Sequence, residues 1–198
     1  MEKALEQLPI NLIKIVLFGP ESTGKTTMSE LLAKHYNTVW VPEYAREYLQ
    51  EKWNNERKTC EDADLIPIAK GQMALENKLA LKADKVLICD TDLLETKVYS
   101  EEYYGGFVHP NLDKFALKNT YDLYLLTNID TPWEADDLRD RPGQREEMYA
   151  AFEAALIKYN KPYIKLNGSI KNRFSVAVSA IDKLLDKRNN LNSYSKSL

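Results

Sequence analysis

The sequence predicts an α/β fold in which a parallel β-sheet is covered by helices on both faces. Short, continuously apolar stretches alternate with longer segments of helical periodicity, and the first apolar stretch leads into a glycine-rich loop and then a helix. Strands that are apolar throughout are typical of parallel sheets buried on both faces. We therefore expect five such strands with helices between them.

The first half of the chain opens with a strand, a loop and a helix. Residues 12–18 form a buried strand, and residues 26–36 follow the loop with apolar side chains at helical spacing. A second, short strand is expected over 38–41. Pro42 disfavours helix in the residue before it, so the next helix is expected over 43–53.

Two further elements complete this half. Residues 62–83 have a helical pattern that contains Pro67, and we expect a kink there because proline removes a hydrogen bond from a helix interior. The apolar run 85–89 predicts the third strand, and a helix follows it to about Tyr104.

The second half contributes the last two strands, over 121–126 and 162–166, with a helix over 145–159 between them. A final helix is expected over 170–185. The polar residues 188–198 are expected to form a frayed tail.

Length and composition fit a single domain over residues 1–187. The chain has 198 residues, of which 44% are hydrophobic and 29% charged, and its net charge is −3. This charge balance argues against a nucleic-acid partner, and no apolar run approaches the ~20 residues that span a membrane. With no secretory signal pattern, and with Cys60 and Cys89 as the two cysteines, we expect a cytoplasmic protein with reduced thiols and no zinc site. The sequence leaves open whether the chain forms a homo-oligomer.

Residues 19–26, Gly-Pro-Glu-Ser-Thr-Gly-Lys-Thr, match the phosphate-loop pattern G-x-x-x-x-G-K-[ST] between a strand and a helix. Glycines let successive backbone N–H groups point to one place, and the helix N-terminus adds partial positive charge there. Lys25 would neutralise phosphate oxygens of ATP or GTP, and the Thr26 hydroxyl would ligate Mg²⁺. The expected nucleotide-binding residues are Gly19, Glu21, Ser22, Thr23, Gly24, Lys25, Thr26 and Thr27.

Two acidic residues follow the third strand, at the edge where parallel sheets bind ligands. Asp90 is expected to hold Mg²⁺ directly or through water, together with Thr26, and Asp92 lies two residues further on. The structural alternative is that Asp90 or Thr91 caps the helix that follows.

Glu43 follows the second strand and begins a helix, so its carboxylate is expected at the same edge of the sheet. There it could accept the proton of an attacking hydroxyl. Arg46 lies one turn later and could bind a ribose hydroxyl, a phosphate or Glu43 itself. The alternative for both residues is a first-turn acid favoured by the helix dipole and a surface ion pair.

A polar segment over about 130–145 carries three arginines, Arg139, Arg141 and Arg145. A loop that brings arginine across a bound nucleotide stabilises charge on the transferred group and excludes water. We expect this segment to be a lid, with at least one of the three guanidinium groups on phosphate. The sequence does not distinguish which one.

Taken together, these stretches resemble the kinase domain of NadR-type proteins, which phosphorylate ribosylnicotinamide with ATP. The resemblance covers about residues 12–185 and rests on the phosphate loop with Glu-Tyr-Ala-Arg-Glu at 43–47 and Asp-Thr-Asp at 90–92. Further matching residues, in the same order, are Thr96, Tyr103, Gly105, His109, Pro110, Trp133, Asp137, Leu138, Arg139, Pro162, Tyr163 and Ile164.

The resemblance implies a P-loop kinase fold with a five-stranded parallel sheet and an arginine-bearing lid. Family members often carry a tryptophan just before the Glu-Tyr pair, where this chain has Pro42. The adenylyl-transfer and DNA-binding functions of full-length relatives are not expected of 198 residues that contain no His-x-Gly-His motif. The residues that the resemblance places near the acceptor or the metal are Glu43, Arg46, Asp90, Asp92 and Tyr103, and Tyr44 is expected to bind the substrate with them.

We therefore expect a kinase that uses ATP and Mg²⁺ to phosphorylate the 5′-hydroxyl of ribosylnicotinamide. Two alternatives stay open: a kinase of another nucleoside or small vitamin, and a regulatory switch that hydrolyses ATP or GTP. The expected catalytic residues are Lys25, Glu43, Asp92, Arg139 and Arg141, with Glu43 or Asp92 as the base.

Overall fold

The structure, a computed structural model, describes residues 2–139 and 142–195. Five parallel strands form one sheet in the order β2-β3-β1-β4-β5, which confirms the α/β class and the number of strands expected. The strands are β1 (Ile13–Phe18), β2 (Trp40–Val41), β3 (Val86–Asp90), β4 (Leu123–Thr127) and β5 (Tyr163–Leu166). The α-helices are α1 (Lys25–His35), α2 (Tyr44–Glu56), α3 (Leu65–Ala80), α4 (Leu93–Tyr103), α5 (Pro110–Lys118), α6 (Arg145–Lys158) and α7 (Ile170–Ser195). Short 3-10 helices are η1 (Glu2–Leu5), η2 (Asp62–Asp64) and η3 (Pro142–Gln144).

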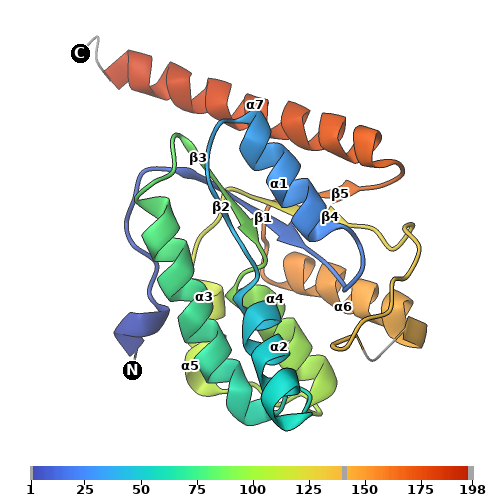
Figure 1. Cartoon of the computed structure of the whole chain (residues 1–198). Coiled ribbons are helices and arrows are strands. Elements are labelled where there is room, and N and C mark those ends of the chain that lie inside the picture. The colour runs from blue at the N-terminus through green and yellow to red at the C-terminus, as the bar shows by residue number, and fades with distance from the viewer. Residues whose placement is uncertain (1, 140–141, 196–198) are drawn as a thin grey trace.

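Helices cover both faces of the sheet, with α1 and α7 on one side and α4 and α6 on the other (Figure 1). Successive side chains of a strand point to opposite faces, so β1 contributes to two cores. Ile15 and Leu17 pack in the cluster that includes α1 and α7, whereas Val16 and Phe18 pack in the cluster that includes α4 and α6. All six residues of β1 are buried, including Lys14, the one charged residue in its otherwise apolar run.

The register of the central strands places the site. Leu17 of β1 lies opposite Asp90 of β3, so the acid that ends β3 stands beside the point where the chain leaves β1. Because the strands are parallel, the segments that follow β1, β2, β3 and β4 all lie at one edge of the sheet.

The long helical pattern over 62–83 divides into η2 and α3. A capping box formed by Glu61 and Asp64 starts η2, and α3 begins at Leu65. Pro67 is therefore the third residue of α3, in the first turn, where backbone N–H groups have no partner within the helix. Proline costs no helical hydrogen bond at that position, which removes the reason for a kink there.

Helix α5 is an element that the sequence analysis did not predict. It begins at Pro110, whose fixed φ suits the first helical position, and Nδ1 of His109 caps it by accepting the N–H of Asn111 at 3.1 Å. Tertiary packing supports this short helix, because Leu112, Phe115 and Ala116 are buried.

The C-terminal helix is longer than expected. The frayed tail predicted from residue 188 is wrong as far as Ser195, because α7 continues from Ile170 to that residue. The sequence after 169 contains neither proline nor glycine, so nothing stops the helix once Ala177 and Ile181 anchor it in the core. Residues 196–198 lie outside the described part. Across the helices that the structure describes, none is both long and apolar enough to cross a membrane.

Candidate active site

The loop between β1 and α1 has the conformation of a phosphate-binding loop. Gly19 and Gly24 have positive φ angles of 136° and 83°, and Ser22 has a φ of 56°. A side chain is excluded at Gly19, because its Cβ would lie 2.8 Å from Oγ1 of Thr127. Left-handed turns of this kind let successive N–H groups converge on an anion at the start of a helix.

Thr23 holds the loop together from inside. Its side chain is almost fully buried, and its hydroxyl donates to the carbonyl oxygen of Pro20 at 2.8 Å. The hydroxyls of Thr23 and Thr127 also share a hydrogen bond of 2.7 Å. Thr127 is the last residue of β4, so this contact joins the loop to the neighbouring strand.

Arg173 of α7 fastens the same loop from the other side, and sequence reasoning missed it. Its side chain is 2% exposed, and it donates to the carbonyl oxygens of Thr23 at 2.7 Å, Asn128 at 3.0 Å and Gly168 at 3.0 Å. It also pairs with Asp130. A buried guanidinium with this many acceptors fixes the phosphate loop, the end of β4 and the start of α7 relative to one another.

Lys25 is the first residue of α1 and is only 8% exposed. Its Nζ donates to the carbonyl oxygens of Gly19 at 2.7 Å and Pro20 at 3.1 Å. It also forms an ion pair with Oε1 of Glu95 at 3.1 Å. The ammonium group is thus held inside the loop that it is expected to serve.

Four ionisable groups share this corner of the structure. Burial lowers the pKa of Lys25, but the charges of Glu95, Glu43 and Asp90 outweigh it and raise that pKa overall. Burial raises the pKa of Glu95 well above its usual range, against the pull of Lys25. Burial and the charge of Glu43 raise the pKa of Asp90 to about 6. Three carboxyl groups therefore face one ammonium group.

The structure brings the two predicted metal ligands together. The Thr26 hydroxyl donates to Oδ2 of Asp90 at 2.6 Å. Asp90 is 1% exposed, and its Oδ1 has no hydrogen-bond partner among the described residues. The capping alternative for Asp90 does not hold, because the N-cap residue of α4 is Asp92.

Asp92 is 1% exposed, and both of its carboxylate oxygens are hydrogen-bonded inside the protein. Oδ1 accepts the backbone N–H of Glu95 at 3.0 Å, and Oδ2 accepts the hydroxyl of Tyr124 at 2.7 Å. It lines neither of the two cavities described below. The structure therefore places Asp92 as a helix cap, and does not bring it to the cavities with the other predicted residues.

The buried position of Asp92 has a consequence for stability. Burial raises its pKa to about 6. The folded state then binds a proton that the unfolded state releases between about pH 4 and 6, so this group lowers the unfolding free energy as the pH rises through that window. The variant Asp92→Asn keeps the cap, because Asn also accepts at the N-cap position, but it has no proton to release.

The wild type should lose unfolding free energy when the pH is raised from 4 to 7.5, and Asp92→Asn should lose up to about 3 kcal/mol less. Urea unfolding of both proteins at the two pH values measures the difference. Parallel pH dependences would show that Asp92 does not carry this linkage.

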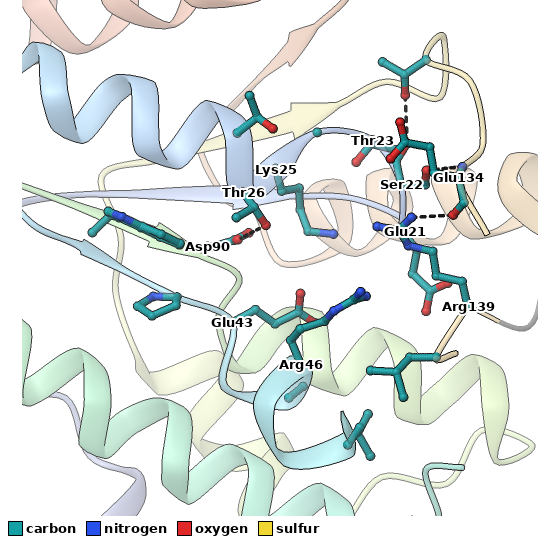
Figure 2. Close-up of a pocket in the computed structure, with 18 of the residues that line it drawn as sticks. Glu21, Ser22, Thr23, Lys25, Thr26, Glu43, Arg46, Asp90, Glu134 and Arg139 are labelled. Carbon is teal, nitrogen blue, oxygen red and sulfur yellow. Dashed lines mark hydrogen bonds between the residues drawn. The ribbon is translucent and has the colours of Figure 1, made fainter. Parts of the chain in front are cut away.

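Glu43 and Arg46 stand across the cavity from the phosphate loop, at the start of α2 (Figure 2). Glu43 is the N-cap residue of α2 but makes no side-chain capping bond. Arg46, whose side chain is 45% exposed, pairs with Asp136 at 2.5 Å rather than with Glu43. Nearby, Nε2 of Gln50 donates to Asp137 at 3.4 Å. Helix α2 is thus fastened to the predicted lid.

The lid arginines have partners within the protein. Arg139 donates to the carbonyl oxygen of Glu134 and pairs with Asp136 at 3.2 Å. Burial raises the pKa of Asp136, but the hydrogen bond from Arg46 and further contacts outweigh this effect and lower it overall. Arg141 lies outside the described residues.

Arg145 is the first residue of α6, and its side chain contacts the backbone of the phosphate loop. Its guanidinium donates to the carbonyl oxygens of Thr131 at 2.9 Å and Ser22 at 3.2 Å. It also lies 5.6 Å from the centre of the Trp133 ring, as in a cation–π contact. Arg145 thus joins the segment after β4 to the phosphate loop, and it does not line the larger cavity.

A cavity of about 640 Å³ opens at this edge of the sheet (Figure 2). Except for Gly19, all the phosphate-loop residues predicted to bind nucleotide line it, as do Glu43, Arg46, Asp90 and Arg139. Trp40 of β2, two residues before Pro42, adds an aromatic wall that was not predicted. Such a volume with a phosphate loop in its wall suits a nucleotide.

A smaller cavity of about 140 Å³ adjoins the first, and Glu21, Glu43 and Leu138 line both. Its walls are mainly apolar and aromatic, and they include Leu65, Ile68, Tyr99, Tyr103 and Tyr104. Tyr103, one of the predicted substrate-binding residues, thus lines this smaller cavity.

Tyr44 lies elsewhere. Its backbone N–H donates to Gln72 at 2.8 Å, and its ring packs so closely on Gly71 that a Cβ there would lie 2.0 Å from it. Tyr44 lines neither cavity.

Sequence reasoning also missed Glu95, which lines the smaller cavity. One signal was available, because Glu95, Tyr99 and Tyr103 recur at intervals of four residues and therefore share a face of α4.

Comparisons with known proteins identify a family and related chains. A family model described as AAA domain matches residues 14–173. The trifunctional NAD biosynthesis/regulator protein NadR of Salmonella typhimurium is 31% identical over 156 residues, which are 79% of this chain and 37% of that protein. This chain therefore spans little more than a third of the length of that relative.

Two solved structures share the fold. A crystal structure of NadR protein in complex with NR superposes with a TM-score of 0.74 at 22% identity and covers 87% of this chain and 50% of that one. A second, of NadR protein in complex with NAD and AMP-PNP, has a TM-score of 0.69 at 22% identity and covers 87% and 49%.

Proposed function

Because the chain belongs to the AAA domain family of P-loop proteins, we propose that it is a kinase that transfers the γ-phosphoryl group of ATP to a nucleoside. The proposed acceptor is the 5′-hydroxyl of ribosylnicotinamide, and the product is nicotinamide mononucleotide. The observation that carries the proposal is the pair of adjoining cavities, one walled by the phosphate loop and the other by aromatic rings, with Glu43 lining both.

The larger cavity supports the ATP half of the reaction. The left-handed turns of the loop direct backbone N–H groups at a phosphate, and α1 begins at the same point. Lys25 needs only to exchange its carbonyl partners, Gly19 and Pro20, for phosphate oxygens. Arg139 and Arg46 line the same cavity and can neutralise further charge if they leave Asp136.

Thr26 and Asp90 fit a magnesium site. Mg²⁺ prefers oxygen ligands, and it is usually held by one or two carboxylates together with substrate phosphates. The unpartnered Oδ1 of Asp90 and the Thr26 hydroxyl supply such oxygens. No group of three or more His, Cys, Asp or Glu side chains that could hold a metal occurs in the described residues, so phosphates would complete the shell. When bound, the ion neutralises charge on the transferred group.

In the proposed reaction, Glu43 accepts the proton of the acceptor hydroxyl. It is the one carboxylate of the predicted pair, Glu43 and Asp92, that lines the cavities. As the hydroxyl oxygen attacks the γ-phosphorus, its proton passes to Glu43 and the bond to ADP breaks. Asp92 keeps its two internal hydrogen bonds throughout.

The smaller cavity supports a planar acceptor. Tyr99 and Tyr103 make an edge-to-face pair with ring centres 5.8 Å apart, and both line the cavity. Aromatic walls suit a heterocyclic base, and the carboxylates beside them suit a ribose hydroxyl. A relative of the same fold was crystallised with NR, which supports ribosylnicotinamide as the acceptor.

The proposal is tested by incubating the purified chain with Mg²⁺-ATP and one nucleoside at a time: ribosylnicotinamide, thymidine or deoxyadenosine. We expect ADP and nicotinamide mononucleotide in equal amounts from the first acceptor. Preferred phosphorylation of another nucleoside would keep the kinase and overturn the acceptor. ADP release without a phosphorylated nucleoside would indicate a nucleotide-dependent switch instead.

The magnesium ligand makes a prediction of its own. In Asp90→Asn the carboxylate charge is lost, so the Mg²⁺ concentration for half-maximal activity is expected to rise about 10–100-fold. Activity measured against Mg²⁺ at saturating ATP shows this shift. Asp84→Asn changes an exposed acid just before β3 and should match the wild type. An unchanged Mg²⁺ requirement in Asp90→Asn would remove Asp90 from the metal site.

A further inference from the structure

Glu95 is a buried carboxylate that the reaction above does not use. It lies in the first turn of α4, is 2% exposed and lines the smaller cavity. Among the described residues, its one ion pair joins Oε1 to Nζ of Lys25, at 3.1 Å. By strict hydrogen-bond geometry, neither of its carboxylate oxygens has a partner among the described residues.

Such a group needs donors. A carboxylate accepts up to about four hydrogen bonds, and a buried one without them carries a desolvation cost. Lys25 donates its hydrogen bonds to the carbonyl oxygens of Gly19 and Pro20 and meets Glu95 only as an ion pair. Of the described residues that line the smaller cavity, none is a lysine or an arginine.

The described side chains next to Glu95 do not donate a hydrogen bond to its carboxylate either. Thr96 directs its hydroxyl to the backbone oxygen of Asp92 at 3.4 Å. Glu43 and Asp90 repel a second negative charge rather than satisfy it, and burial with these charges raises the pKa of Glu95. Among the described residues, Oε2 of Glu95 is thus a buried acceptor without a hydrogen-bond donor, on a residue that lines the smaller cavity.

We propose that Glu95 is an acceptor-binding residue, whose carboxyl group bridges Lys25 on one side and a hydroxyl group of the nucleoside on the other. This inference rests on the proposed function and adds the residue that recognises the sugar. The bridge places the acceptor hydroxyls at a defined distance from the ammonium group that binds the phosphates. Glu95 then belongs to both substrate sites, and Glu43 is free to act on the reacting hydroxyl.

The test is Glu95→Gln, which keeps one oxygen for Lys25 and replaces the other by an amide that cannot accept. We expect the KM for ribosylnicotinamide to rise about 10–100-fold, as for loss of a hydrogen bond to a charged group, with a smaller change in kcat. The KM for ATP should stay within about threefold, because the Lys25 contact remains. Glu102→Gln, an exposed change on the same helix, should match the wild type.

Nucleosides that lack one ribose hydroxyl provide the second measurement. The wild type should bind the 2′-deoxy or the 3′-deoxy analogue more weakly than the complete nucleoside. Glu95→Gln should bind both alike, because the carboxylate that contacts the missing hydroxyl is already absent. An unchanged KM for the nucleoside, or a rise confined to the KM for ATP, would reduce Glu95 to a support for Lys25. Calorimetric titration of the wild type with the nucleoside separates the kinase proposal from the Glu95 proposal. Binding of the nucleoside without phosphoryl transfer would overturn the kinase alone, and absence of binding would overturn both.

Discussion

The variant Lys25→Met is expected to lose at least about 10²–10³-fold in kcat/KM. Lys25 is the one described lysine in the wall of the larger cavity, and its Nζ already lies among the carbonyl oxygens of the phosphate loop. Methionine fills the same space but cannot neutralise phosphate charge in the transition state. Initial rates over a range of ATP concentrations measure the loss.

The structure adds a stability effect to this prediction. Lys25 is the ion-pair partner of buried Glu95, so its removal leaves a carboxyl group without a counter-ion. We expect Lys25→Met to melt at a lower temperature than the wild type, and Lys25→Met with Glu95→Gln to recover part of that loss. Both the single and the double variant are expected to stay inactive.

Lys34→Met is the control for this pair of variants, because Lys34 is an exposed residue of the last turn of α1. It should keep both the activity and the melting temperature. Near-wild-type turnover in Lys25→Met would remove Lys25 from the phosphate site and with it the main support for phosphoryl transfer.

The variant Glu43→Gln is expected to lower kcat about 10²–10⁴-fold, because the amide cannot accept the proton of the acceptor hydroxyl. The KM for ATP should change little, since the phosphate loop, Lys25 and Asp90 remain. Steady-state kinetics with ribosylnicotinamide as the acceptor separate the two parameters.

Asp92→Asn is the informative comparison for Glu43→Gln. Both residues are carboxylates at strand ends, but only Glu43 lines the cavities, whereas Asp92 caps α4. We expect Asp92→Asn to lose far less kcat. Glu47→Gln, an exposed change one turn along α2, should behave as the wild type. A larger loss in Asp92→Asn than in Glu43→Gln would reverse the assignment of the base.

Much of the architecture could be predicted because it depends on local patterns. The six apolar or amphipathic residues of β1, the loop after it and the helix that begins at Lys25 are adjacent in the chain. Their spacing alone indicates a strand, a turn with positive φ angles and a phosphate-binding helix N-terminus. Parallel topology then placed Asp90 beside that loop, and the structure puts it on Thr26.

The errors occurred where packing decides the outcome. Nothing in the sequence after residue 188 is apolar enough to require a helix, but α7 continues because its earlier turns are anchored in the core. Pro67 suggested a kink only because the start of α3 was placed too early. Tyr44 matched a family motif, but the absence of a side chain at Gly71 leaves its ring a place to pack away from the cavities.

The sequence by itself determined the strand–loop–helix that cradles phosphate, the parallel sheet and the acidic residues gathered at its edge, because each depends on neighbours a few positions apart. Tertiary structure alone decided which polar groups meet. Asp92 is satisfied by Tyr124, 32 residues away, and so becomes a cap, while Arg173 reaches Thr23 across 150 residues and fastens the loop. Glu95 lies against Lys25 for the same reason. The partner of a buried charge depends on which groups the packed core brings close to it, and sequence periodicity does not predict that.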